Sequence, residues 1–440
     1  MNIKIRYTFL LLILLGNIQF CRTQDFKILG GEDTHSMSFK FVNNLIILPM
    51  EVNGTELNFI LDSGVGSAVV FNLTTSDSLE FKHVEIVKLK GLGAGDAVIA
   101  LKSKRNRFKI RNLYATNKDL FIINNNKLNL SAKLGLTVHG LIGYDLFKDF
   151  IVTINYASKR ITFSDPKTYK YRKCRKCEVF DLDFFKKKPY INGIVSFNEP
   201  NNKPKEVKLL IDSGGTDALW LFESDEMEIP KNSFKDFVGE GISGSIYGMR
   251  NKLKSFSLKS FVLEKPNITY LDTLSTVIAR RHKARDGSLG SGILSRFKVI
   301  FDYPNSKITL KKNSRFGNEF RYNMSGIEVV YGGEILVKEL QQASFELSSS
   351  NSDIITLNYN YKFKFKPIYS ISHIRDNSPA SEVGIREGDF LVEINGKKAY
   401  NYKLGEIIEK FYGKNNKKVK LLIDRNGERL KFEFRLRKIL

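Results

Sequence analysis

The sequence predicts a mostly β protein in which two related lobes stand in tandem and a separate domain follows them. An apolar run ending in Asp-Ser-Gly occurs twice, at residues 58–64 and 208–214. Each copy is followed by a matching tail, and after the second tail the pattern of strands and turns changes. A content of 12% aromatic residues, mostly Phe and Tyr, suits β-rich structure. The predicted units are residues 38–168, 169–312 and 318–440.

The matching tails extend the repeat well beyond the Asp-Ser-Gly motif. Residues 140–163 contain Gly-Leu-Ile-Gly followed by two strand-like runs, and residues 287–310 repeat this order after Gly-Ser-Leu-Gly. Aligning the two tails places Tyr156 on Tyr303. Each lobe therefore carries its own motif and its own acid.

The duplicated motif resembles that of the pepsin and retropepsin class of aspartic proteases. In that class an apolar-Asp-Thr/Ser-Gly turn is crossed from beneath by a later apolar-Gly segment. The resemblance covers about residues 38–312 and implies a bilobal acid protease fold with two related β-barrel lobes. It also implies that Asp62 and Asp212 are the catalytic residues. Val65 and Gly215, which follow the two motifs, depart from the small alcohol or alanine usual in the class.

A pair of aspartates gives a chemical reason for the repeat. Two adjacent carboxylates cannot both ionise cheaply, so the pair holds one proton, as aspartic protease dyads are known to do. The ionised acid can take a proton from a water while the protonated acid polarises a peptide carbonyl, so no covalent intermediate is needed. Gly64 and Gly214 permit a tight turn, and the hydroxyls of Ser63 and Ser213, standing where threonine is commoner, can bond to the opposite loop.

The alternative is a purely structural role, in which Asp62 and Asp212 only cap turns after two strands. The catalytic interpretation is favoured because motif, spacing and tails agree. His139, beside the first Gly-Leu-Ile-Gly segment, reads as a turn or core residue, since the dyad needs no such partner. No metal, nucleotide or organic cofactor is predicted.

Glycine clusters around Gly93 and Gly241 fall where pepsin-like proteins place a hairpin flap over the cleft. Such flaps would exclude water and bind the peptide backbone. Plain turns between strands are the alternative, and both interpretations stay open at this stage. Tyr247 is either a flap aromatic or an ordinary packing residue.

The segment 374–396 looks like the centre of a PDZ domain. A strand leads to a short helix that begins at Ser378 and stops at Gly384, and Asn-Gly turns the next strand. Residues 404–412 would form the helix beside the peptide groove. Upstream, Gly326 and Ile327 match the carboxylate-binding loop and the strand that accepts a ligand, with residues 340–361 as an insertion. PDZ domains bind extended peptides, often C-termini, by adding a strand to a sheet edge.

The N-terminal residues 1–23 read as a secretory signal, because basic residues precede the apolar run 8–15. That run is too short for a permanent membrane span, and no later segment is long and apolar enough. Cleavage near Thr23 is favoured over a lipid anchor at Cys21, because the residues before Cys21 lack the small side chains of a lipoprotein signal. The expected location is the periplasm, the cell envelope or the exterior.

Two cysteines remain after such cleavage, Cys174 and Cys177. A zinc site needs about four ligands and no second pair exists, so a local disulfide in the lobe linker is expected. The formal charge of +23 could attract an anionic partner. The lysines are spread along the chain without a nucleic-acid module, so no nucleic-acid partner is predicted and only weak attraction to an anionic envelope surface stays open.

The sequence therefore predicts a secreted aspartic endopeptidase that hydrolyses peptides or proteins, with a PDZ domain that captures peptides, among them protein C-termini, or regulates the enzyme. A non-catalytic envelope scaffold that binds peptides through its cleft and PDZ groove is the alternative. The PDZ domain could also be a structural cap that binds nothing.

Overall fold

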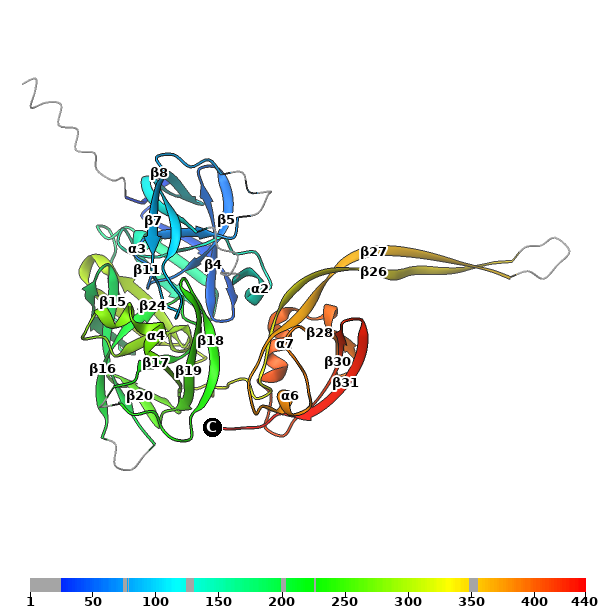
Figure 1. Ribbon diagram of the computed structural model, residues 1–440. Coiled ribbons are helices and arrows are strands. Elements are labelled where there is room, and N and C mark those ends of the chain that lie inside the picture. The colour runs from blue at the N-terminus through cyan, green and yellow to red at the C-terminus, as the bar shows by residue number, and fades with distance from the viewer. Residues whose placement is uncertain are drawn as a thin grey trace, which may run out of the picture.

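A computed structural model describes residues 25–73, 77, 79–123, 130–198, 203–224, 227–347 and 355–440. The predicted signal 1–23, with Cys21, lies outside the described residues. Figure 1 shows two adjacent β bodies, blue to cyan and green to yellow, and a separate C-terminal body in orange and red. Strands dominate all three, which confirms the predicted mostly β fold class.

The first lobe is built on one large sheet with strand order β1-β9-β6-β10-β5-β4-β8-β7, in which β3 pairs with β4. Its helices are α2 (Leu130–Leu134) and α3 (Tyr144–Phe147), and the 3-10 turn η1 (Leu29–Gly31) follows β1. Its strands are β1 (Lys27–Ile28), β3 (Lys40–Val42), β4 (Leu45–Val52), β5 (Thr55–Leu61), β6 (Ala68–Phe71), β7 (Glu85–Leu89), β8 (Val98–Ile110), β9 (Leu113–Ile123) and β10 (Gly140–Ile142).

The second lobe has a sheet of order β18-β19-β22-β17-β23-β16-β15-β20-β21, in which β14 pairs with β15. Its short helices are α4 (Thr273–Thr276), α5 (Ser291–Leu294) and the 3-10 turns η2 (Ala279–Arg281) and η3 (Tyr303–Asn305). Its strands are β14 (Asp183–Phe185), β15 (Lys188–Ser196), β16 (Lys205–Asp212), β17 (Leu219–Phe222), β18 (Phe234–Gly241), β19 (Gly244–Lys252), β20 (Ser255–Leu258), β21 (Phe261–Glu264), β22 (Asn267–Leu271) and β23 (Gly287–Gly290).

The two lobes repeat one strand arrangement around their acidic motifs. In the first lobe β10 runs parallel to β5 and antiparallel to β6. In the second, β23 runs parallel to β16 and antiparallel to β17. The Gly-Leu-Ile-Gly and Gly-Ser-Leu-Gly tails thus pass beside the strands that lead to the acids. At Gly143 an added Cβ would lie 1.8 Å from the carbonyl oxygen of Asp62, so only glycine fits there.

A third sheet joins the lobes, in the order β13-β25-β24-β11-β12-β2. Its strands are β2 (Thr34–Ser38), β11 (Ile151–Asn155), β12 (Arg160–Ser164), β13 (Cys177–Asp181), β24 (Phe297–Asp302) and β25 (Lys307–Lys312). The two tails meet where β11 pairs with β24, and Figure 1 shows these two strands next to each other. The described fold starts before residue 38, because β1 pairs with β9 and β2 pairs with β12.

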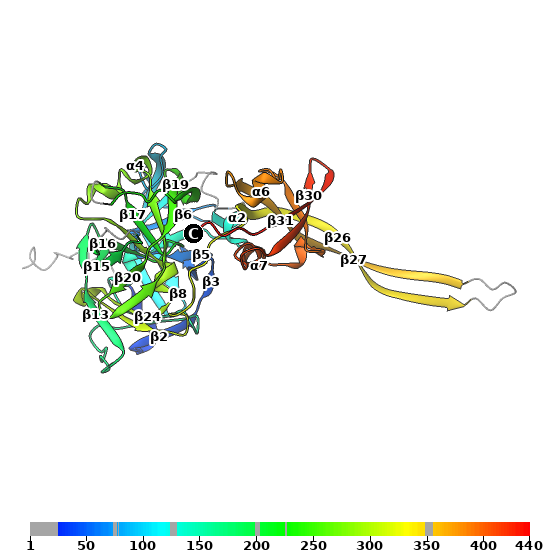
Figure 2. The same ribbon diagram turned by 90° about the horizontal axis from the view of Figure 1, so that it is seen from below.

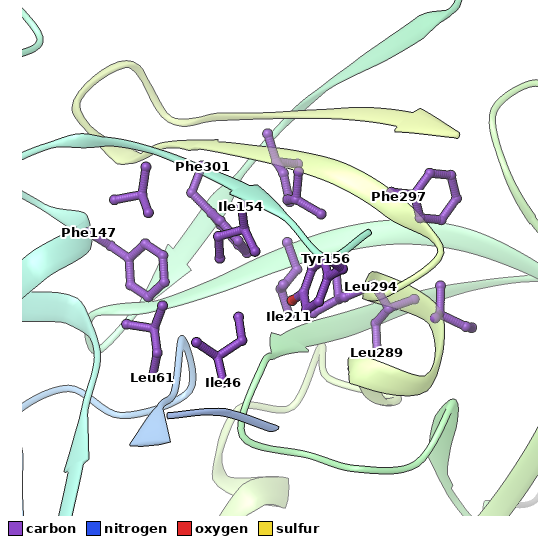
Figure 3. Packing of buried hydrophobic residues seen from close by; sticks show 14 of the residues in the cluster. Ile46, Leu61, Phe147, Ile154, Tyr156, Ile211, Leu289, Leu294, Phe297 and Phe301 are labelled. Atoms are coloured by element: carbon purple, nitrogen blue, oxygen red, sulfur yellow. The ribbon is translucent and has the colours of Figure 1, made fainter. Parts of the chain in front are cut away.

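One hydrophobic core extends through both lobes. Phe147 of the first lobe packs on Phe301 and Tyr303 of the second, with ring centroids 4.8 Å and 5.1 Å apart. Figure 3 shows Leu61 and Ile211, which precede the two acids, within this packing. The strand ends that carry the acids therefore rest on a shared, fully buried base.

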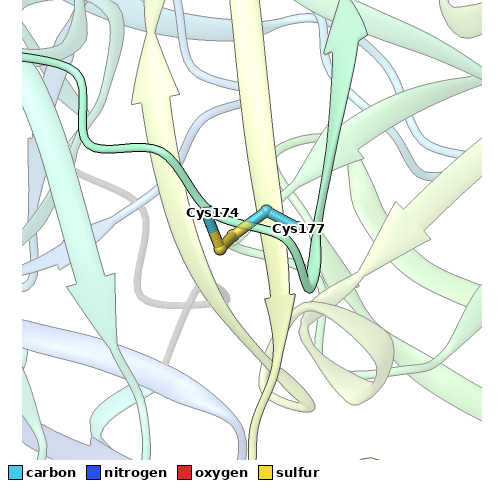
Figure 4. The surroundings of a disulfide bond; sticks show 2 residues. All are labelled: Cys174 and Cys177. Carbon is cyan, nitrogen blue, oxygen red and sulfur yellow. A yellow bond between two sulfur atoms is a disulfide. The ribbon is translucent and has the colours of Figure 1, made fainter.

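The expected disulfide is present between Cys174 and Cys177, with Cα atoms 5.5 Å apart (Figure 4). It closes a short loop at the start of β13, where the chain passes from the first lobe to the second.

The C-terminal domain has sheet order β26-β27-β28-β30-β31, with the short strand β29 paired to β28. Its elements are β26 (Ile327–Leu347), β27 (Ile355–Ile374), α6 (Pro379–Glu382), β28 (Phe390–Ile394), β29 (Lys397–Lys398), η4 (Ala399–Asn401), α7 (Leu404–Phe411), β30 (Lys418–Arg425) and β31 (Glu428–Arg435). Ser378 caps α6 as the sequence predicts, and Gly384 after it has a φ of +86°.

The predicted insertion at 340–361 covers the outer half of the hairpin β26–β27, and residues 348–354 within it lie outside the described residues. This hairpin projects far from the rest of the molecule in both Figure 1 and Figure 2. Among the described helices, none has the length and apolar character that crossing a membrane requires.

Candidate active site

The two acidic motifs lie at equivalent strand ends, one in each lobe. Asp62 directly follows β5 and Asp212 is the last residue of β16. A Cβ added to Gly64 would lie 3.1 Å from Oδ1 of Asp62 and 3.6 Å from Oδ1 of Asp212. Although they are far apart in sequence, the two carboxyl groups therefore flank one small space.

Reciprocal hydrogen bonds hold the two loops together. The hydroxyl of Ser63 donates to the carbonyl of Ile211 at 2.7 Å, and that of Ser213 donates to the carbonyl of Leu61 at 2.8 Å. Each hydroxyl also accepts the backbone N–H of the other serine, at 2.9 Å and 3.0 Å. Both serines are fully buried, so this network fixes one loop relative to the other.

Both motif glycines lie in close contact with the carboxyl groups of the two acids. The N–H of Gly64 donates to Oδ1 of Asp62 at 2.7 Å, and the N–H of Gly214 donates to Oδ1 of Asp212 at 3.0 Å. A Cβ on Gly214 would fall 2.4 Å from Oδ2 of Asp62. Any larger residue at this position would displace the carboxyl group of the other lobe.

Burial and mutual repulsion favour protonation of the two acids. Burial and the neighbouring Asp212 charge raise the pKa of Asp62 to about 7. Burial also raises the pKa of Asp212, although Arg285 and Lys188 oppose the rise. Groups of this kind share a proton over a wide pH range.

Two cations lie beside the acids. Lys188 begins β15, and its charge acts on both Asp62 and Asp212. Arg285 is buried and donates to the carbonyl of Gly287 at 2.9 Å and to the hydroxyl of Ser288 at 2.6 Å. Burial lowers the pKa of Lys188, and the nearby Arg285 charge lowers it further.

The two glycine clusters that the sequence allows to be either flaps or plain turns meet each other. Two backbone hydrogen bonds join the loop between β7 and β8 to the turn between β18 and β19. The N–H of Ser243 donates to the carbonyl of Leu92 at 3.0 Å, and the N–H of Gly95 donates to the carbonyl of Ser243 at 2.7 Å. A Cβ on Gly93 would lie 2.6 Å from the carbonyl oxygen of Gly244, and one on Gly241 would lie 2.1 Å from that of Leu92. Gly93 and Gly241 are therefore contact points between the tips.

A cavity of about 1870 Å³ contains the acid pair and reaches the C-terminal domain. Leu92 and Ile242 line it from the two loop tips. Val329 and Tyr331 of β26 and Leu404 of α7 line the same cavity from the C-terminal domain. The space between β26 and α7 is thus continuous with the space above the acids.

The C-terminal domain packs on the β18–β19 hairpin through buried charges. Arg250 of β19 donates to Asp236 of β18 at 2.7 Å and to Asp217 at 3.1 Å. Arg375, just after β27, lies 3.7 Å from Asp236 across the domain boundary. Burial and the Asp236 charge raise the pKa of Glu328 in β26 to about 7.

In the loop that the sequence assigns to carboxylate binding, backbone N–H groups donate hydrogen bonds to side chains of the loop itself. Oδ1 of Asn323 accepts the N–H groups of Ser325 and Gly326, at 3.0 Å and 3.2 Å. The N–H of Ile327 donates to the hydroxyl of Ser325 at 3.0 Å. A ligand role for Gly326 and Ile327 stays a prediction, while the residues that face the cavity are further along β26.

His139 and Tyr247 have structural surroundings. The Nδ1 of His139 accepts the N–H of Asn58 at 2.9 Å, and its ring is not among those lining the cavity. Tyr247 packs edge-on against Phe237 and lies 6.2 Å from the ring of His373. Sequence reasoning missed Lys188 and Arg285, because each lies in a basic segment of the chain and nothing in such a segment marks proximity to an acid.

Comparison with known protein families gives two matches. A family model described as aspartyl protease matches residues 48–146, which include the first acidic motif. A model described as PDZ domain matches residues 370–425. The second motif, with Asp212, lies outside both matched segments, and its relation to the first rests on the geometry above. The chain therefore contains an aspartyl protease domain and a C-terminal PDZ domain.

Proposed function

We propose that the protein is an aspartic endopeptidase in which Asp62 and Asp212 activate one water molecule. The observation that carries this proposal is the pair of buried carboxyl groups flanking one small space, each on a loop locked to the other by serine hydroxyls. A buried pair with raised pKa values exists in a singly protonated form near neutral pH.

In this form the ionised aspartate accepts a proton from the water molecule while the oxygen of that water attacks the peptide carbonyl carbon. The protonated aspartate donates its proton toward the carbonyl oxygen and forms a neutral tetrahedral diol. Collapse of the diol breaks the C–N bond, with a proton passed to the leaving nitrogen, so the products are a carboxylic acid and an amine. Ser63, Gly64, Ser213 and Gly214 hold the acids in register.

Closure by Gly93 and Gly241 at the loop tips would exclude bulk water from this chemistry. The PDZ groove opens on the same cavity, which supports a role in holding a peptide that also reaches the acids. The disulfide between Cys174 and Cys177 supports secretion into an oxidising compartment.

The test is incubation of the purified protein with denatured casein and a peptide library, followed by mass spectrometry. The proposal predicts internal cleavage that falls at least about a thousandfold in Asp62→Asn and in Asp212→Asn. If the wild type binds peptides but cleaves none, the protein is a peptide-binding scaffold and the enzymatic proposal is wrong.

A further inference from the structure

One side of the cavity beside the acids carries a cluster of positive charge, which we call the basic wall. It is formed by the turn between β14 and β15 and by the segment around η2, both in the second lobe. Its five cationic residues all line the cavity: Lys186, Lys187, Lys188, Arg281 and Arg285.

The basic wall is not neutralised by the protein's own carboxylates. In the described part of the chain, none of its five residues forms an ion pair with Asp or Glu; the nearby Asp183 is paired with Lys208 instead. Other carboxylates of the cavity are engaged elsewhere, Asp217 with Arg250 and Glu240 with Lys133. The wall therefore presents positive charge to whatever enters the cavity.

The acid pair offsets only part of this charge. Sharing one proton, Asp62 and Asp212 carry a single negative charge together, whereas Lys188 and Arg285 supply two positive charges beside them. Lys188 is largely removed from water, and no hydrogen bond of its amine is found within the described residues. A buried cation without a bonded anion favours an anionic ligand.

Aromatic rings give the wall a fixed shape. His282 stacks on Phe185 with ring centroids 4.3 Å apart and meets Tyr190 edge-on at 4.6 Å. Nε2 of His282 is buried and has no hydrogen-bond partner in the described part of the chain. His282 lines the same cavity as the cations.

We propose that the basic wall is a specificity subsite for a substrate carboxylate, held by Lys188 with its neighbours Lys187 and Arg285. The carboxylate comes either from a Glu or Asp side chain close to the scissile bond or from a free C-terminus within the cleft. The inference rests on the proposed peptidase function and adds the class of substrate. A charge-assisted contact of this kind distinguishes a carboxylate from the isosteric amide.

The experiment takes a peptide that the enzyme cleaves and replaces each position around the scissile bond in turn by Glu and by Gln. A parallel pair compares a free C-terminal acid with a C-terminal amide. The proposal predicts a kcat/KM at least about tenfold higher for the acid than for the amide at one location. Preference at an internal position identifies a side chain, and preference at the end identifies the terminus. Equal rates for all pairs would overturn the subsite.

Variants then assign the preference to the wall. Lys188→Gln is expected to reduce the acid-to-amide ratio at least about fivefold, and Lys187→Gln, at an exposed position, is expected to reduce it in the same direction. Lys311→Gln, on the exposed face of β25, is the matched control and keeps the ratio. The charge of Lys188 also acts on Asp62 and Asp212. If Lys188→Gln lowered kcat/KM equally for the acid and amide peptides, with an unchanged ratio, Lys188 would serve only the two aspartates.

A binding measurement separates failure of the subsite from failure of the peptidase. Labelled Glu and Gln peptides are titrated into the Asp62→Asn, Asp212→Asn double variant. If the Glu peptide binds more tightly than the Gln peptide and the wild type cleaves neither, the subsite is supported and the peptidase proposal is rejected. Cleavage without acid preference in either assay supports the enzyme and rejects the subsite.

Discussion

At the centre of the molecule, each serine of the Asp-Ser-Gly loops bonds to the loop of the other lobe. Removing the Ser63 hydroxyl would leave the N–H of Ser213 and the carbonyl of Ile211 buried without these partners. We expect Ser63→Ala to lower the free energy of unfolding by about 1–3 kcal/mol. Ser63→Thr keeps the hydroxyl and should lose less. Urea denaturation of both variants is the measurement, and equal stabilities would show that the network contributes little.

Burial of Asp62 predicts a definite pH dependence of stability. Its pKa is raised from 3.8 to about 7 on folding, so the folded state binds more protons than the unfolded state between these values. Wild-type stability should therefore fall as pH rises from about 4 to about 7. Asp62→Asn lacks this penalty, so its advantage should grow over that window, to on the order of a few kcal/mol.

Thermal or urea unfolding at several pH values measures this difference. Asp181→Asn, at an exposed position of β13, is the control and should track the wild type. An Asp62→Asn variant that is less stable than the wild type at neutral pH would contradict the assigned direction of the pKa shift.

At the residue scale, the sequence could single out Asp62 and Asp212 as a pair, because each stands in an Asp-Ser-Gly motif and the motif occurs twice. Lys188 shows where such reasoning stops. It lies in a run of three lysines within a chain of net charge +23, so its type carries little information. Its importance comes from the β14–β15 turn, which brings it beside two acids from different lobes, and only the folded chain shows that.

At the scale of elements, the loop tips form the contact most sensitive to side-chain size. Gly93 has a φ of +116°, and an added Cβ would clash with the backbone of Gly244. We expect Gly93→Ala to separate the tips and to reduce peptide cleavage at least about tenfold in kcat/KM. Gly317→Ala is the control, because nothing lies within 4 Å of its added Cβ. Equal activity of the two variants would show that the tip contact is dispensable.

The sequence located both glycine clusters but could not predict that they touch. A cluster of glycines indicates a turn, whereas the bond between Gly95 and Ser243 depends on how one lobe faces the other. The paired strands of the joining sheet set that orientation, and the sequence identifies the tails that form β11 and β24 only as a repeat.

At the scale of the whole molecule, the PDZ domain is docked on the second lobe through the β18–β19 hairpin. Arg375 contributes an ion pair to Asp236 and lies 4.6 Å from the ring centroid of Phe234. We expect Arg375→Ala to loosen this docking and to speed amide hydrogen exchange in β18 and β19. Arg435→Ala, on the exposed face of β31, should leave that exchange unchanged. Unaltered exchange in Arg375→Ala would mean that the hairpin is ordered without the PDZ domain.

The order of the domains could be inferred from local patterns, since each domain carries its own motifs. Their arrangement could not, because it depends on a few side chains that look ordinary in sequence. Glu328 is an example, since it follows the predicted ligand loop yet lies close enough to Asp236 of the second lobe for their charges to interact. A cavity shared by the PDZ groove and the acids has no signature in either segment alone.

The most direct test of the proposed dyad is the pH dependence of kcat/KM for one cleaved peptide. A shared proton predicts a bell-shaped profile whose alkaline limb lies near pH 7, since deprotonation of the second acid leaves no group to polarise the carbonyl. Asp62→Asn and Asp212→Asn should each abolish cleavage across the whole range. Cleavage that persists in the double variant, or a wild-type rate that stays flat well above neutral pH, would contradict the account.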